Sequence, residues 1–423
     1  MPLCSLRYFL VFALASMAFC TLSIGQQDEP KTAPAQSAPS PAPAKDDPAR
    51  DHALELYRAG NFVEAMPLLE QLSADHPNDV VVKEAWAFSV LGYSATLTDP
   101  ELCKKARVRA RNIALQAKHL GDNSDLLKVL MDIPEDGSQP AFSDRKEVDD
   151  AMKAGEADFV RGDFDRAREG YLRALLLDPK NYTAALFIGD VYFKQHVYGS
   201  AGEWFAKAIE IDPDRETAYR YWGDALWALG KSAEAREKYI QAVIAEPYNN
   251  QRSWMGLNEW AERNKVTLNW VRLQDKAAVS QEDNTHINVT IDDSLTKKDD
   301  HSMAAWLAYG LSRASWKGDK FKKEFPNEPK YRHTMREEVD SLHMMSTVLA
   351  GDKDFQKNQD KLEPSLLQLI KIDQAGFLEP FGLLNRADGE IAQDYAPYRA
   401  THRDTLYRYF DEFVVPKAPA QSQ

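Results

Sequence analysis

Small and aromatic residues recur in the centre of the chain with a fixed spacing of 34 residues. Small residues keep this spacing in three sets: Gly155, Gly189 and Gly223; Ala167, Ala201 and Ala235; Ala174, Ala208 and Ala242. Aromatic residues and prolines follow it at Tyr171, Phe205 and Tyr239 and at Pro179, Pro213 and Pro247. A period of this length predicts units of two antiparallel helices, in which small residues let the backbones approach and proline ends the second helix.

These residue types at this period resemble the tetratricopeptide repeat family. The expected units are Val148–Asn181, Tyr182–Arg215 and Glu216–Asn249, and the first departs from the pattern with Asp158 where an aromatic residue is usual. One unit cannot bury its apolar face alone, so neighbouring units must stack. The resemblance implies a right-handed superhelix whose concave groove binds a peptide or a partner helix.

Helices are also expected on both sides of this array. Residues 250–262 (NQRSWMGLNEWAE) predict a capping helix, which gives an array over 148–263. Upstream, Gly60, Ala65 and Pro77 lie 102 residues, or three periods, before Gly162, Ala167 and Pro179. We therefore predict degenerate repeat-like helices over 46–133, with a repeat at 46–79 and a helix pair at 80–94 and 101–120, followed by a linker at 132–144.

The pattern changes after Asn264. Alternating and β-branched residues at Val266–Leu273 and His286–Ile291 predict a small hairpin. Helices without the period are expected at 303–316, 331–349, 365–374 and 397–414, within a domain over 264–415 and before a disordered tail at 416–423. The predicted fold class is an all-α solenoid of tetratricopeptide repeats followed by a mostly helical C-terminal domain with a β-hairpin.

The N-terminal residues are typical of an export signal. Arg7 precedes the apolar run Tyr8–Cys20, and Ser23 and Gly25 are small residues suited to signal peptidase, so 1–25 is predicted to be cleaved. The alternative is an uncleaved anchor over 8–25, which is 18 residues long. Residues 26–45 are rich in proline and alanine and predict a disordered linker. This order of segments resembles exported bacterial envelope proteins and predicts a periplasmic or secreted location.

Composition narrows the function classes. The net charge of −13 disfavours nucleic acid as a partner, because phosphates would be repelled. Outside the signal, Cys103 is the one cysteine, so no internal disulfide is expected. The sequence has no Gly-rich phosphate loop, Gly-x-Ser-x-Gly elbow or His-Glu-x-x-His motif. We therefore predict a non-enzymatic scaffold without a cofactor, binding a protein or peptide and contacting a membrane only if the N-terminal segment is uncleaved.

In this family the first helix of each unit lines the groove. The matching positions here are Glu156, Phe159, Leu186, Asp190, Phe193, Lys194, Arg220, Asp224 and Trp227. The row of acids replaces the Asn and Lys of relatives that clamp a terminal carboxylate, which favours a partner with basic and apolar side chains. The alternative is that these acids are solvated surface residues. Trp227 is predicted to anchor the partner and Trp222 to lie in the core.

The C-terminal region offers two further hypotheses. A basic cluster could bind an anionic ligand or could be a solvated loop, and comprises Lys317, Lys320, Lys322, Lys323, Lys330 and Arg332. His333, Glu337 and Asp340 share a helix face and could bind a metal, although the polar face of an amphipathic helix is the preferred interpretation, so no metal is predicted. An enzyme with a pocket joining His333, Glu337 and His343 is the rival function, and pairing of the repeats with themselves is a second. The oligomeric state stays open.

Overall fold

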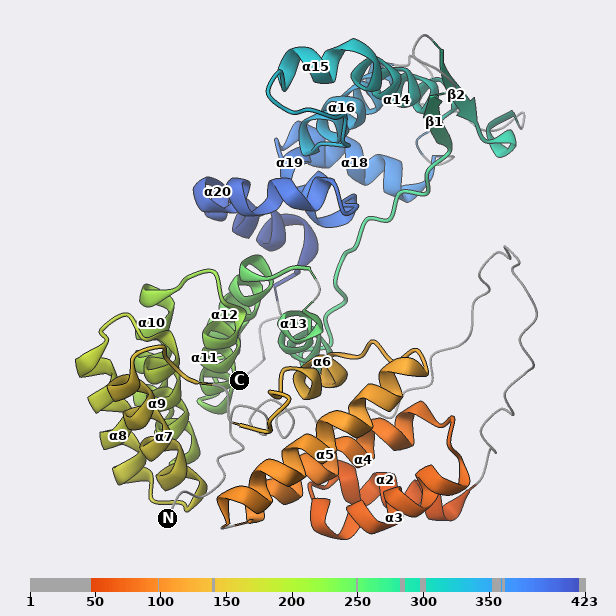
Figure 1. Cartoon of the computed structure of the whole chain (residues 1–423). Coiled ribbons are helices and arrows are strands. Elements are labelled where there is room, and N and C mark those ends of the chain that lie inside the picture. The colour runs from red at the N-terminus through yellow and green to blue at the C-terminus, as the bar shows by residue number, and fades with distance from the viewer. Residues whose placement is uncertain are drawn as a thin grey trace. The chain divides into compact units, whose positions relative to one another are not determined.

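The computed structural model describes residues 47–97, 99–138, 141–248, 250–281, 286–296, 302–351, 359 and 362–417. The predicted signal peptide, the Pro/Ala-rich linker and residues 418–423 of the tail lie outside this range. The chain divides into two compact units between His196 and Val197. Figure 1 labels helices and strands of both units. Among the helices in the described range, none has both the length and the apolar character needed to span a membrane.

The first unit begins with five helices around one core. They are α2 (Pro48–Arg58), α3 (Phe62–Asp75), α4 (Val80–Thr96), α5 (Pro100–His119) and α6 (Asp125–Met131). Aspartates start three of them, because the side chains of Asp47, Asp79 and Asp99 accept backbone N–H groups of the first turn. The short α6 was not predicted, and Ser124 caps it in the same way.

The repeat helices of the first unit are α7 (Lys146–Val160), α8 (Phe164–Leu177) and α9 (Tyr182–Lys194). The periodic glycines allow α7 and α8 to touch. A Cβ atom on Gly155 would lie 2.8 Å from the Tyr171 ring, and one on Gly170 would lie 2.6 Å from the Gly155 Cα. Backbone contact at this crossing therefore requires glycine on both helices.

The second unit starts with α10 (Tyr198–Ile211), α11 (Glu216–Ala228), α12 (Ser232–Ala245) and α13 (Gln251–Arg263). The same packing recurs, since a Cβ atom on Gly223 would lie 2.6 Å from the Tyr239 ring. Tyr239 also packs against Gly256 of α13. The predicted capping helix thus contacts the aromatic residue that fills the third repeat.

The turn between the two helices of a repeat needs a left-handed residue. Gly162 and Gly230 occupy this position with φ of 79° and 74°. In the repeat between them the residue is His196, with φ of 60°. A side chain in this region costs about 1–2 kcal/mol relative to the right-handed conformation, so His196 is a strained member of the series.

The C-terminal part of the second unit is mostly helical and has one two-stranded antiparallel sheet, as predicted. Strand β1 (Ala277–Gln281) pairs with β2 (Ile287–Ile291), and Ala277 lies opposite Ile291. The helices are α14 (Met303–Ser315), α15 (Phe321–Glu324), α16 (Met335–Gly351), α18 (Pro364–Gln374), α19 (Leu378–Asn385) and α20 (Tyr395–Tyr409). Short π-helical turns at 316–320 and 410–414 and 3₁₀ turns at 293–296 and 391–394 complete this part.

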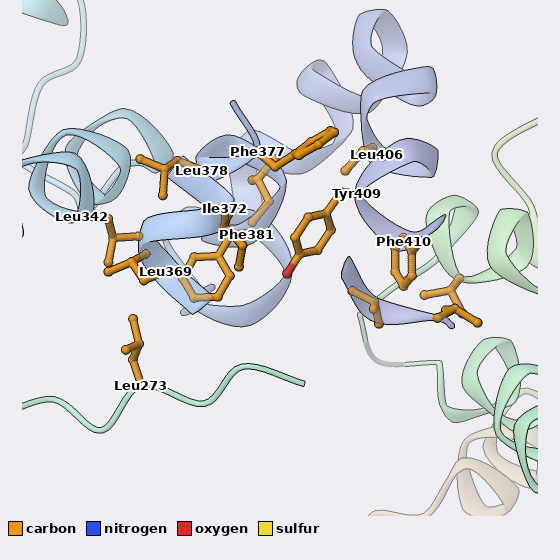
Figure 2. Close-up of a cluster of buried hydrophobic side chains, with 14 of the residues drawn as sticks. Leu273, Leu342, Leu369, Ile372, Phe377, Leu378, Phe381, Leu406, Tyr409 and Phe410 are labelled. Carbon is orange, nitrogen blue, oxygen red and sulfur yellow. The ribbon is translucent and has the colours of Figure 1, made fainter. Parts of the chain in front are cut away.

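One apolar core joins the C-terminal helices to the third repeat. Figure 2 shows part of it, with Phe377, Phe381, Leu406, Tyr409 and Phe410 grouped between α18, α19 and α20. The same cluster continues into buried residues of α12 and α13. The domain boundary predicted near 264 lies within this continuous core.

Two predicted element boundaries are wrong. Val266–Leu273 is not a strand: residues 266–276 are extended, and the alternating Val266, Leu268 and Trp270 pack against the core. The helix predicted from Tyr331 begins at Met335, because the Thr334 hydroxyl accepts the Glu337 N–H at 3.2 Å and caps the helix there. The hairpin uses the weaker alternation of Ala277–Gln281 instead.

Candidate functional site

The predicted groove residues are divided between the two units. Helices α7 and α9 of the first unit carry Glu156, Phe159, Leu186, Asp190, Phe193 and Lys194, and α11 of the second carries Arg220, Asp224 and Trp227. These side chains fall into two classes. Glu156, Asp190, Arg220 and Leu186 are buried, whereas the aromatic residues, Asp224 and Lys194 keep accessible surface.

Glu156 and Asp190 are buried and Asp224 is half-buried. Glu156 is 1% exposed and accepts a hydrogen bond from the Tyr171 hydroxyl at 2.9 Å. Asp224 accepts one from the Tyr239 hydroxyl at 2.8 Å. Asp190 is also buried, at 7% exposed. In the first and third repeats the acid thus links the first helix to the second through a hydrogen bond. This structural role differs from both alternatives drawn from the sequence, which were contact with a partner and solvation at the surface.

Burial affects how these groups titrate. Burial raises the pKa of Asp224 above its ordinary range, although the nearby Arg220 charge and the Tyr239 hydrogen bond lower it. Burial also raises the pKa of Tyr239, and the Asp224 charge raises it further. The raised pKa of Tyr239 keeps its phenol protonated at neutral pH, so the hydroxyl donates this bond.

Two further predicted groove residues are structural. Arg220 is 8% exposed, and its Nε donates to the Glu216 carboxylate at 3.0 Å, one helical turn earlier. Its guanidinium also lies 4.7 Å from the centre of the Tyr221 ring. Leu186 is 6% exposed and lies within the packed face of α9. None of these side chains presents a surface to a partner without moving.

The aromatic residues of the predicted groove remain partly accessible. Phe159, Phe193 and Trp227 are 34 residues apart, lie in the last turn of α7, α9 and α11, and are half-buried. The Phe159 ring lies 5.4 Å from Phe164, and the Arg263 guanidinium lies 5.3 Å from the Trp227 ring. We call these three periodic residues the aromatic ladder. Phe159 and Phe193 lie in the first unit, together with exposed Lys194, and Trp227 lies in the second.

Trp222 packs against the apolar core, but it is not fully buried within it as the core prediction implied. It is half-buried and contacts the site of Gly202, where a Cβ atom would lie 2.8 Å from the indole nitrogen. The Lys238 ammonium lies 3.7 Å from the ring centre. Trp222 therefore packs at the surface of α10 and α12 beneath a lysine side chain.

A pocket that the sequence analysis missed lies between α7 and α8. It has a volume of about 450 Å³ and is lined by Glu147, Asp150, Ala151, Ala154, Asp158, Arg166, Glu169, Gly170 and Arg173. Its α7 residues recur every three or four positions and lie on the helix face opposite Glu156. The small residues at 151, 154 and 170 were the available sequence signal, because they leave space beside the charged residues that line the pocket.

Two of the six residues in the predicted anionic-ligand patch form ion pairs. Lys320 pairs with Asp340 at 2.5 Å, and Arg332 pairs with Glu328 and Asp394 at 2.9 and 2.6 Å. The Lys317 ammonium lies 5.5 Å from the Tyr331 ring. The exposed members are Lys322, Lys323 and Lys330.

His333 lies in a buried charged network instead of a pocket. Its Nε2 is 3.1 Å from Glu338 and its Nδ1 is 2.8 Å from Asp388. Arg386 Nε donates to Glu338 at 2.7 Å, and the Tyr309 hydroxyl donates to the same carboxylate at 2.8 Å. Both ring nitrogens of His333 face carboxylates, so the imidazolium satisfies both contacts.

The network shifts the titration of both partners. Burial acts to lower the pKa of His333, but the hydrogen bonds to Glu338 and Asp388 and the Glu338 charge together outweigh it, and the pKa is raised. Burial acts to raise the pKa of Glu338, yet the contacts with His333 and Arg386 lower it to about 2. Both shifts favour the charged forms of the pair.

The side chains proposed for metal binding or catalysis do not converge. Glu337 accepts hydrogen bonds from Arg313 at 3.1 Å and Tyr331 at 2.9 Å. Asp340 contacts Lys320, and His343 pairs with Asp373 at 3.0 Å. Within the described part of the chain, no three His, Cys, Asp or Glu side chains form a group suited to a metal ion.

The tetratricopeptide repeat family matches residues 152–216, which run from α7 to the start of α11. These residues are tetratricopeptide repeats. The predicted fold class is confirmed: tetratricopeptide repeats are followed by a mostly helical C-terminal part with one hairpin. No curated protein matches the chain significantly.

Several solved tetratricopeptide structures are similar to parts of the chain. The first TPR of Spaghetti, bound to an HSP90 peptide, is 24% identical, with coverage of 29% of this chain and 96% of that chain and a TM-score of 0.26. MamA is 18% identical, with coverage of 48% and 94% and a TM-score of 0.24. YrrB, a TPR protein with an unusual peptide-binding site, is 13% identical, with coverage of 50% and 91% and a TM-score of 0.26.

Proposed function

We propose that the chain is a non-enzymatic protein-interaction scaffold of the bacterial cell envelope, in which the first helices of the tetratricopeptide repeats bind a partner protein or peptide. The aromatic ladder of Phe159, Phe193 and Trp227 carries this proposal. Aromatic side chains that keep accessible surface are the residue type that most often anchors a partner. Their shared position in each repeat supports a common role.

The partner's chemistry follows from which groove residues remain available. The acids Glu156 and Asp224 are bonded to tyrosines of their own repeats, so they do not select a basic partner. The accessible set is aromatic, with the exposed ammonium of Lys194 at the end of α9. A segment with apolar side chains and a nearby carboxylate suits this set best.

A photo-reactive amino acid introduced at Lys194 tests the proposal in the protein's own cell envelope. Lys180 is the matched control, because it is also an exposed lysine but lies in the turn before α9. We expect a partner to be cross-linked from position 194 and not from 180, and the cross-link to be lost with Phe193→Ala. No cross-link at 194, or the same products at both positions, would refute a role for this face.

The envelope location rests on the N-terminal sequence. Cleavage after Gly25 would release a chain that begins at Gln26. The mass of the protein isolated from its host tests this directly. A chain that keeps residues 1–25 would instead support anchoring through the apolar segment at 8–25.

A further inference from the structure

One face of the first repeat is open on the side away from the aromatic ladder. Here α7 and α8 pack side by side (Figure 1). The pocket of about 450 Å³ lies between them. Ala151, Ala154 and Gly170 line it, so another helix could approach the two backbones closely. In a repeat array this position is normally covered by the preceding repeat.

Apolar exposure marks the same face. Leu176 lies one turn beyond Arg173 on α8 and is 82% exposed, more than any other large apolar side chain in the described residues. Leu172, also on α8, is 40% exposed. Exposed leucines beside a cavity lined by alanine and glycine are typical of an interface whose second half is missing.

The charges around the pocket are separated between the two helices. The acids Glu147, Asp150 and Asp158 lie on α7, and the basic residues Arg166 and Arg173 lie on α8. Glu169, on α8, is the exception to this separation. A uniformly acidic rim would favour a basic partner. When the rim is mainly acidic on one helix and mainly basic on the other, a two-fold rotation brings the acidic helix of one copy opposite the basic helix of a second copy.

We propose that this face binds the same face of a second copy of the chain, with α7 of one copy against α8 of the other. The two-fold arrangement places the acids of each α7 opposite the arginines of the partner's α8, and it does so twice. It also covers Leu176 of both copies. The dimer interface is separate from the aromatic ladder and leaves it free for the proposed partner.

The area of the α7–α8 face limits the affinity of the proposed dimer. Helices of 15 and 14 residues are about 21 Å long. Two helices of this length form an interface near the lower limit of about 1,200 Å² for specific complexes. We therefore expect a reversible dimer whose population depends on protein concentration in the micromolar range.

Sedimentation velocity of the purified protein over a range of concentrations tests the proposal with paired charge reversals. Arg173→Glu and Asp150→Lys each place like charges across the interface, and we expect each to weaken dimerisation at least tenfold. Mixing the two variants in equal amounts should restore it, because each altered residue then faces its complement. Lys180→Glu, an exposed reversal outside the face, should dimerise like the wild type.

The outcomes decide the question. A wild-type protein that stays monomeric at all concentrations overturns the proposal. A dimer that neither reversal weakens shows that another surface forms it and overturns the proposal equally. Both altered residues have exposed side chains, so unchanged circular dichroism spectra are expected. If the mixture dimerises again, misfolding did not cause the weaker association of each variant alone, because misfolded variants could not pair with each other.

Discussion

Replacing Tyr171 by phenylalanine tests whether the groove acids hold the repeats together. The change removes the hydroxyl that donates to Glu156 at 2.9 Å and keeps the ring that fills the space beside Gly155. Phe205 occupies the equivalent position of the second repeat, so a phenylalanine ring is compatible with this architecture. The substitution therefore removes a hydrogen bond without creating a large cavity.

The expected cost follows from the burial of both partners. Tyr171 is 0% exposed and Glu156 is 1% exposed, so water does not replace the lost donor. Leaving a buried acceptor without its donor costs about 1–3 kcal/mol of the free energy of unfolding. With a urea dependence of about 2 kcal/mol per molar, the unfolding midpoint should fall by about 1 M.

The measurement must report on the first unit alone, because two units need not unfold together. Hydrogen exchange of the amides in α7 and α8 during a urea titration provides this. Tyr192→Phe is the control, since that half-buried tyrosine of α9 packs beneath Arg168 through its ring, and it should shift stability by less than about 0.5 kcal/mol. If Tyr171→Phe behaves like this control, the acid is not a structural partner and the groove interpretation of Glu156 must be reopened.

Three further changes test other features of the packing. Gly170→Ala should destabilise the first unit by about 1–2 kcal/mol in a urea titration, because its Cβ would press on the Gly155 backbone and this outweighs the gain in helix propensity. The same change at Gly199, where nothing lies within 4 Å, should be neutral or stabilising. His196→Gly should raise the free energy of unfolding by up to about 1 kcal/mol, because glycine adopts a positive φ without strain. An unchanged or lower free energy of unfolding would contradict the strain assigned to His196. Because the pKa of His333 is raised in the folded protein, its contribution to the free energy of unfolding is complete below pH 6.5, the ordinary pKa of histidine, and is lost as the pH rises through the folded pKa. His333→Gln should therefore flatten the pH dependence of the free energy of unfolding between about pH 6 and 9.

The repeats were predictable because their period is a direct consequence of how they pack. Gly155 and Gly223 recur since each must admit a ring, and Tyr171 and Tyr239 recur since each must fill the space. Two separate residue types therefore report the same contact. The C-terminal part has no such redundancy, and there the extended segment 266–276 has the same alternation as a strand because it lies along the core.

The chemistry of the groove was harder to predict, because an acid on an amphipathic helix has the same sequence signature whether it is buried or exposed. The deciding partner of Glu156 lies 15 residues further on, in Tyr171, and the same spacing relates Asp224 to Tyr239. Phe205 breaks this series in the second repeat. A search for acid and tyrosine at this spacing would have identified the buried pairs in the first and third repeats.

The C-terminal helix limits which surface of the third repeat can be functional. Within the second unit, Tyr395 donates to the Ile244 carbonyl at 2.7 Å, and Arg403 donates to the Tyr219 hydroxyl at 3.0 Å and to the Pro213 carbonyl at 2.6 Å. These bonds use groups on α12 and at both ends of the turn between α10 and α11. Since α20 covers α12, a partner of this repeat must approach the end of α11, where the Trp227 ring is still partly accessible.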